Sequence, residues 1–239
     1  MKVRYFLGQR IAFIRQFYVV TSAPYVERKR KIEAEEAPWV PGYSEDGEPW
    51  FLEEWLEADE SLQVLGRSCI SMLVATLHVY FKTWQQLINK PIDESMKVAF
   101  KNGWLNGYKE YFACHVRIKF EKAPVSLAVL EELVLARNRI QHPESITTDT
   151  SHFSNADLEK MPRPFFIDER DSSLLSEADE GECAWLLPPA IHVSAEKLEC
   201  ALKEVEQFAE WLETVESEPD DGQIAAPPQG TPAATARIL

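Results

Sequence analysis

A long stretch without proline, residues 50–89, constrains the fold of this chain more than any other feature. Its apolar residues recur at steps of three and four, which places them on one side of a helix. Acidic residues crowd its first turns, where the helix dipole favours negative charge. The pattern predicts one long helix with a buried face made of Leu62, Leu65, Cys69, Met72, Leu73, Thr76, Tyr80, Trp84 and Leu87.

Helical patterns also precede and follow this stretch. Residues 3–20 form one predicted helix, Pro24 breaks or kinks it, and residues 25–37 form a second piece. Asp93 is placed to cap a further helix, which Gly103 and Gly107 make irregular. The helical patterns of this first part of the chain predict an all-α fold.

Two more amphipathic helices complete the predicted bundle. One runs from Val125 to about His142 and ends there because Pro143 disfavours helical geometry at the preceding residue. The other begins after Ser194, a good N-cap residue, and continues to about Val215. We therefore expect one helical domain over residues 1–216.

The segment 144–193 departs from this pattern. It reads as loop with one short helix after Asn155 and two strand candidates, residues 165–167 and 184–187. We expect a small insert there, either irregular or a β-hairpin. Residues 217–239 are rich in proline and small residues, which predicts a disordered tail.

The charge of the chain is strongly acidic and uneven. There are 25 basic and 39 acidic residues, a net charge of −14, which excludes a uniformly basic nucleic-acid binder. The acidic residues concentrate in 168–221, whereas residues 1–31 are basic. The run Arg28, Lys29, Arg30 and Lys31 could follow an RNA backbone, but a plain exposed helix face is the better explanation of it.

The four cysteines form no C-x-x-C pair, and no histidine lies at zinc-finger spacing from them. We therefore predict no metal, no cofactor and no disulfide framework. Arg10 and Arg15 interrupt the apolar N-terminal stretch, so it does not resemble a signal peptide. These features predict a cytoplasmic protein that does not enter a membrane.

The residues that could form a functional site lie at the end of the predicted helix that precedes Pro143. Arg137 lies among apolar positions, where a guanidinium needs an anion, either a carboxylate of the bundle or a phosphate. On a helix, Glu131, Asn138 and His142 share one polar column. Arg137 itself lies away from that column, so the candidate catalytic set of Arg137, Asn138 and His142 follows from a family resemblance.

This arrangement resembles the Arg-Asn-x-x-x-His motif of the HEPN superfamily, in which an arginine precedes a histidine by a short spacing at the end of a bundle helix. The resemblance covers about residues 1–143 and 190–215 and leaves out the insert. It implies an all-α bundle that forms a homodimer with two motifs in one cleft. Many members are metal-independent ribonucleases, often toxins or phage-defence effectors, and others are inactive partners.

The residue types fit such a reaction. RNA cleavage without a metal needs a base for the 2′-hydroxyl proton and an acid for the leaving 5′-oxygen, and histidine titrates in the right range for both. Arg137 can hold the scissile phosphate through two hydrogen bonds. Asn138 can orient His142 or bind the phosphate, and Arg139 is a weaker substrate-binding candidate beside them.

Two functions from different classes remain open, and an amphipathic membrane-surface protein that uses residues 2–31 is a weak third alternative. The first is a HEPN-type metal-independent endoribonuclease acting on RNA, with an antitoxin or other protein partner. The second is a catalytically inactive HEPN-like interaction or regulatory protein, in which Arg137 pairs with a carboxylate and His142 merely ends a helix. The intact motif favours the first, and the net charge of −14 favours the second.

Overall fold

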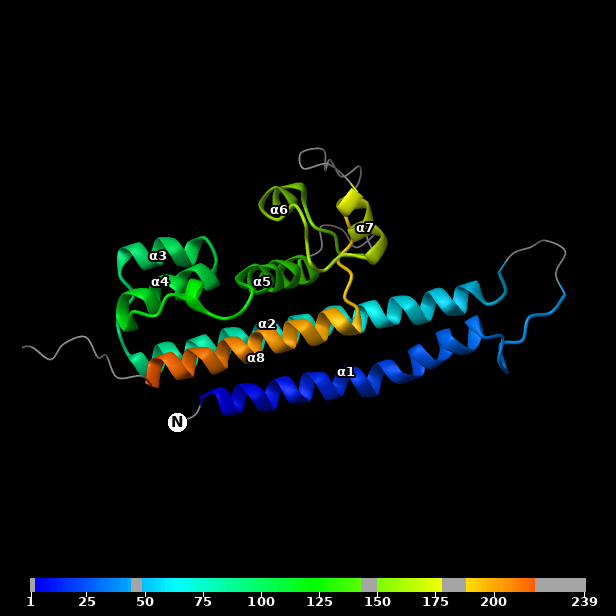
Figure 1. The fold of residues 1–239 in the computed structure, drawn as a ribbon, viewed down its shortest axis with the longest axis horizontal. Helices are drawn as coiled ribbons and strands as arrows, with labels where there is room; N and C mark the ends of the chain where they lie inside the picture. Colours follow the sequence, from blue (N-terminus) through cyan, green and yellow to red (C-terminus); the bar gives the residue numbers. More distant parts are fainter. Residues whose placement is uncertain (1–2, 44–48, 143–149, 178–187, 218–239) are drawn as a thin grey trace, which may run out of the picture.

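The computed structural model describes residues 3–43, 49–142, 150–177 and 188–217, which form a bundle of helices (Figure 1). Two long helices, α1 (Val3–Glu33) and α2 (Leu52–Ile88), run antiparallel, and α8 (Ala195–Ser217) packs along both. Helix α5 (Leu127–Gln141) covers α2 and α8 from the side opposite α1. The all-α fold class predicted from the sequence is confirmed.

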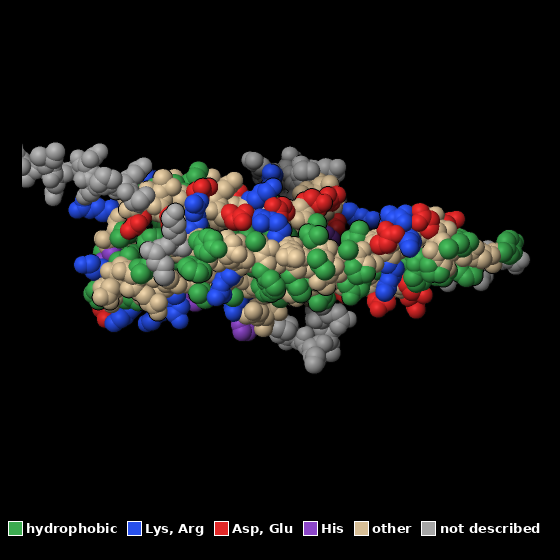
Figure 2. Space-filling view, turned by 90° about the horizontal axis from the view of Figure 1, so that it is seen from below, with side chains coloured by type: hydrophobic (Ala, Val, Ile, Leu, Met, Phe, Trp, Pro, Cys, Tyr) green, Lys and Arg blue, Asp and Glu red, His purple; other side chains and the backbone are tan. Residues whose placement is uncertain are grey.

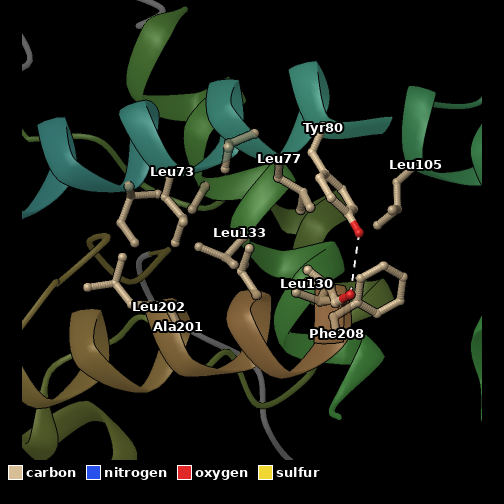
Figure 3. Close-up of a cluster of buried hydrophobic side chains, with 14 of the residues drawn as sticks. Leu73, Leu77, Tyr80, Leu105, Leu130, Leu133, Ala201, Leu202 and Phe208 are labelled. Carbon is tan, nitrogen blue, oxygen red and sulfur yellow. Dashed lines mark hydrogen bonds between the residues drawn. The ribbon is translucent and has the colours of Figure 1, made fainter. Parts of the chain in front are cut away.

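The core lies where α2, α5 and α8 meet (Figure 3). Leu73 and Leu77 of α2 face Leu133 of α5, and all three are fully buried. Tyr80 donates its hydroxyl to the Ala209 carbonyl at 3.4 Å, which satisfies a polar group inside the core. Each fully buried aliphatic side chain stabilises the fold by about 1.5–3 kcal/mol.

Aromatic side chains attach the next helices to this core. Helices α3 (Glu94–Lys101) and α4 (Trp104–Val116) pack on each other, and a short 3₁₀ turn (Phe120–Lys122) follows. The ring of Phe81 lies 5.1 Å from Tyr108 and 5.5 Å from Phe120. Phe120 in turn lies 4.9 Å from Phe208, so α2, α4 and α8 share one aromatic cluster.

Helix α2 is the centre of the bundle. In the described part of the chain it is the one helix whose length and composition would allow it to cross a membrane. However, 61% of its most apolar stretch is buried within the protein. Burial of this extent is typical of a core helix of a water-soluble protein.

Of the two alternatives predicted at Pro24, a break or a kink, the break is wrong, because α1 continues through Pro24 to Glu33. Proline leaves the carbonyl of Val20 without its helical partner, but Val20 and Pro24 both lie on the solvent side, where water can bond that carbonyl. The helix is also held on both sides of the proline. Tyr18 is buried before it, and Lys29 contacts Asp59 of α2 at 2.5 Å after it.

The described part of the insert is irregular and helical. Helix α6 (Asn155–Lys160) confirms the expected short helix, and α7 (Glu169–Glu177) was not predicted. The strand predicted at 165–167 is wrong, because these residues form bends. A single antiparallel bridge joins His152 and Ala190. The other strand candidate, 184–187, and the predicted disordered tail, apart from Ser217, lie outside the described residues.

A close approach at Gly66 of α2 gives a test of this packing. A Cβ at Gly66 would lie 2.8 Å from the carbonyl oxygen of Val193, which is backbone and cannot easily move, whereas a Cβ at Gly8 meets nothing within 4 Å. Gly66→Ala should lower the free energy of unfolding by about 1–2 kcal/mol, even after the gain in helix propensity. Gly8→Ala should raise it by about 0.5–1 kcal/mol. Urea unfolding of both variants checks this, and equal effects would contradict it.

Candidate functional site

Helix α5 positions the motif. Ser126 caps its start by accepting a hydrogen bond from the Val129 amide at 3.4 Å. Burial of Leu130, Leu133 and Ala136 fixes the rotation of the helix about its axis. Arg137 consequently lies at the edge of the core, half-buried, and Asn138 lies on the exposed side.

The guanidinium of Arg137 bonds its neighbour in the sequence. Its Nη1 donates to Oδ1 of Asn138 at 3.0 Å. Within the described residues Arg137 forms no ion pair with a carboxylate, so the buried pair considered from the sequence is not what this structure contains. A half-buried cation bonded only to a neutral amide retains its attraction for an anion.

His142 lies one turn further on, just after the last residue of α5. Its backbone N–H donates to the Asn138 carbonyl at 3.1 Å, and the residue is exposed. Asn138 therefore contacts both other members of the motif, Arg137 through its side chain and His142 through its carbonyl. Glu131, expected in the same polar column, instead pairs with Lys109 of α4.

The side chain of Arg139, a substrate-binding candidate in the sequence, is bound within the protein. Its Nε donates to Asp157 at 2.7 Å and its Nη2 donates to Ser154 at 2.6 Å, both at the start of α6. Burial raises the pKa of Asp157, but the hydrogen bonds from Arg139 and Ser154 outweigh this and hold that pKa below its usual value. The arginine assigned to substrate by sequence analysis thus fastens α6 to α5.

The basic run on α1 is neutralised and lies away from the motif, toward the far end of α1 (Figure 1). Arg28 contacts Glu57 at 3.1 Å, and Lys29 contacts Asp59. Arg30 binds both Glu27 and Glu36, and Lys31 lies 3.6 Å from Glu27. The structure therefore does not bring this run together with Arg137, Asn138 and His142.

A histidine that sequence analysis did not include lies near Arg137. The imidazole of His78 stacks on Trp104 with centroids 4.7 Å apart and planes 16° apart. Burial lowers the pKa of His78, and the charges of Lys82 and Arg137 lower it further, so this imidazole is neutral at pH 7. A lone histidine on an apolar helix gives no sequence signal of such a contact.

Glu132 is a second residue that sequence reasoning missed. It is buried on α5, and its two carboxylate oxygens accept the backbone N–H groups of Phe165 and Phe166, each at 2.7 Å. These bonds explain why residues 165–167 form no strand. The amides of Phe165 and Phe166 donate to a side chain and are therefore not available to a neighbouring strand. Lys197 bonds the Ile167 carbonyl and adds a second anchor for the same turn.

The described residues contain no group of three or more His, Cys, Asp or Glu side chains able to hold a metal ion. Cys69, Cys114 and Cys200 are free thiols. Comparison with family models, curated proteins and solved structures finds no match for the chain. The likeness to the HEPN superfamily accordingly rests on the motif and its place at the end of a bundle helix.

The different surroundings of Arg137 and Arg139 predict different effects of their removal. Arg139→Ala leaves the buried Asp157 without its cation and should lower the free energy of unfolding by about 1–3 kcal/mol. Arg137→Ala removes no ion pair within the described residues and should change it by about 0.5 kcal/mol or less. Thermal unfolding of both variants measures the contrast, and a larger loss for Arg137→Ala would refute it.

The contribution of Glu132 to stability can be tested by comparing its replacement with that of Glu131, its neighbour on the same helix. Glu132→Gln places an amide N–H against a backbone N–H and should destabilise the protein by about 1–3 kcal/mol, whereas Glu131→Gln, at an exposed position, should change stability by less than about 1 kcal/mol.

The difference between Glu132→Gln and the wild type should also depend on pH. Burial raises the pKa of Glu132 above its ordinary value of 4.5, so the stability linked to its protonation is complete below 4.5 and is lost as the pH rises. The advantage of the wild type over Glu132→Gln should therefore be larger at pH 4 than at pH 7. Urea unfolding of both proteins at the two pH values measures this, and an advantage that grows with pH would be the contrary result.

Proposed function

We propose that this protein is a HEPN-type, metal-independent endoribonuclease of the cytoplasm that acts as a toxin or phage-defence effector. One observation supports this proposal most strongly. Arg137 lies beside the exposed Asn138 and His142 with no carboxylate partner among the described residues. Arg139 and the run 28–31, by contrast, are all bound to carboxylates.

Each motif residue has a distinct role in the proposed reaction. Arg137 binds the scissile phosphate and stabilises the charge that develops on it. His142 takes the proton of the attacking 2′-hydroxyl, and an imidazolium protonates the leaving 5′-oxygen. The products are a 2′,3′-cyclic phosphate and a 5′-hydroxyl. Asn138 holds the guanidinium in place through its side chain and is a positioning residue in this scheme.

The reaction requires an acid and a base at the same time, and each motif contributes one histidine. In the proposed enzyme a homodimer supplies the second motif, as the family resemblance implies. Residues 28–31 are a weak site for the RNA backbone, because RNA phosphates must compete there with Glu27, Glu36, Glu57 and Asp59.

The second candidate function is a catalytically inactive HEPN-like interaction protein. The neutralisation of the basic run on α1 favours it, because this surface has no excess positive charge for RNA, and the whole chain carries a net charge of −14. Such a protein would bind a protein partner or an antitoxin. Activity measurements separate the two candidates directly.

A nuclease assay with EDTA present tests the endoribonuclease. The wild type should cleave single-stranded RNA, and His142→Ala should lose about 10²–10⁴-fold in rate because a general acid–base group is gone. Arg137→Ala should also lose activity while keeping its thermal stability. Cleavage should weaken as salt rises, since releasing the counterions of the phosphates gains less free energy at a higher salt concentration.

His152→Ala is the matched control, because His152 is an exposed histidine outside the motif. It should leave the rate unchanged. Cleavage that persists unaltered in His142→Ala, or that needs an added divalent metal, would contradict the proposed chemistry. A wild type without any cleavage would favour the interaction protein.

A further inference from the structure

Helices α2, α4 and α5 bring basic side chains together next to the motif. His78 and Lys82 lie one turn apart on the same side of α2. Trp104 of α4 stacks on the imidazole of His78, with ring centroids 4.7 Å apart, and so holds this ring in a fixed orientation. Arg137 of α5 lies close enough for its charge to act on the same imidazole. We call His78, Lys82 and Arg137 the basic cluster.

The packing of α5 on α2 explains why these side chains converge. Leu133 of α5 packs beside Leu77, the residue that precedes His78 on α2 (Figure 3). Arg137 follows Leu133 by one turn, and a helical side chain leans toward the N-terminus of its helix. The guanidinium therefore reaches back along α5 toward the level of His78. Lys82 leans back toward His78 for the same reason.

No carboxylate of the described residues neutralises the basic cluster. Residues 61–88 contain no acidic residue, so this part of α2 offers no partner to Lys82. Of the acidic residues of α5, Glu131 pairs with a lysine of α4, and Glu132 is buried and accepts hydrogen bonds from backbone amides. Lys82 and Arg137 are thus two cations without an ion pair in the described part of the chain.

The side of α4 that faces the basic cluster is aromatic. Trp104 and Tyr108 both contact the imidazole of His78, with ring centroids 4.7 Å and 6.1 Å away. Glu110 is exposed and, two residues after Tyr108, lies on a different side of the helix. The charges that act on His78 from the described residues are both positive, and both lower its pKa.

The far end of α1 shows the opposite arrangement. Its basic residues 28–31 are bound to carboxylates, and Figure 2 shows basic and acidic side chains next to one another toward this narrow end of the molecule. An anion must compete there with carboxylates that are already in place. At the basic cluster it meets no such competitor from the described residues. Two cations from different helices also fit an extended polyanion better than a single small anion.

We propose that the basic cluster is a binding site for the backbone of single-stranded RNA and extends the motif to the phosphate next to the scissile one. Arg137 binds the scissile phosphate, and Lys82 binds its neighbour along the strand. The imidazole of His78 forms no hydrogen bond within the described residues and donates its N–H to a phosphate oxygen between them. Trp104 is a positioning residue for this ring. The inference rests on the proposed function, because that function supplies RNA as the ligand.

Fluorescence anisotropy with a short, labelled 2′-O-methyl oligouridylate tests the site without cleavage, because this probe lacks the attacking hydroxyl. The full chain should bind the probe, and Lys82→Gln should bind it at least about threefold more weakly. The slope of log Kd against log salt concentration should become shallower by about 0.7, the change expected for one lost phosphate contact of a single strand. Lys82→Arg should restore both values, because it keeps the positive charge.

Lys90→Gln is the matched control, because Lys90 is an exposed lysine just past the end of α2 and forms no ion pair within the described residues. It should bind the probe as tightly as the wild type does. Three results would overturn the inference: a wild type that does not bind the probe, an unchanged affinity in Lys82→Gln, or an equal loss in both lysine variants.

The imidazole of His78 gives a second measurement, which a merely structural role of Lys82 would not change. Lys82 and Arg137 lower the pKa of His78, so Lys82→Gln should raise that pKa toward its ordinary value of 6.5. Saturating probe should raise it in the wild type as well, because a bound phosphate offsets the two cations. NMR titration of the five histidines measures both effects. A pKa of His78 that the probe leaves unchanged would contradict the site.

Failure of this inference and failure of the proposed function give different results. If the wild type cleaves RNA in EDTA but Lys82→Gln binds the probe normally, the nuclease stands and the basic cluster is not its phosphate site. If the probe binds through Lys82 and shifts the pKa of His78 but RNA is not cleaved, the RNA-binding site stands and the proposed nuclease fails.

Discussion

The fold depends on the burial of α2, which different helices cover on its different sides. Helix α1 packs along one side, α5 packs along the opposite side, and α8 contacts all three of these helices. The buried residues of α2 extend from Ala58 to Trp84, so the other helices pack against α2 along most of its length. The turn of α5 that carries Arg137 is fixed in this way, since Leu133 and Ala136 pack into the same core.

Much of this architecture could be predicted from local sequence signals. The apolar period of residues 50–89 predicted α2, and the capping residues Asp93 and Ser194 located the starts of α3 and α8. These signals are local, so a single sequence contains them. Helix α7 gave no such signal, because its residues are mostly acidic and polar.

Long-range contacts explain what the sequence could not predict. Pro24 was expected to break or kink α1, but the burial of Tyr18 before it and the contact of Lys29 with Asp59 of α2 after it hold both parts of the helix against the bundle. In the candidate site, the position of Arg137, Asn138 and His142 at the end of a helix was predicted correctly. The contact of Arg139 was not predicted, because its partner Asp157 lies on another helix. The hydrogen bonds of Glu132 were not predicted either, because it accepts them from backbone amides more than thirty residues away.

The order in which the helices emerge during synthesis has a consequence for folding. Helix α8 contributes Leu202 and Phe208 to the core around Leu73 and Leu77, yet it is made long after α2. Until it leaves the ribosome, the most apolar face of α2 lacks one of its covers. Closure of the core therefore requires contacts between distant parts of the chain, which slow folding and leave apolar surface open to aggregation or to chaperones in the meantime.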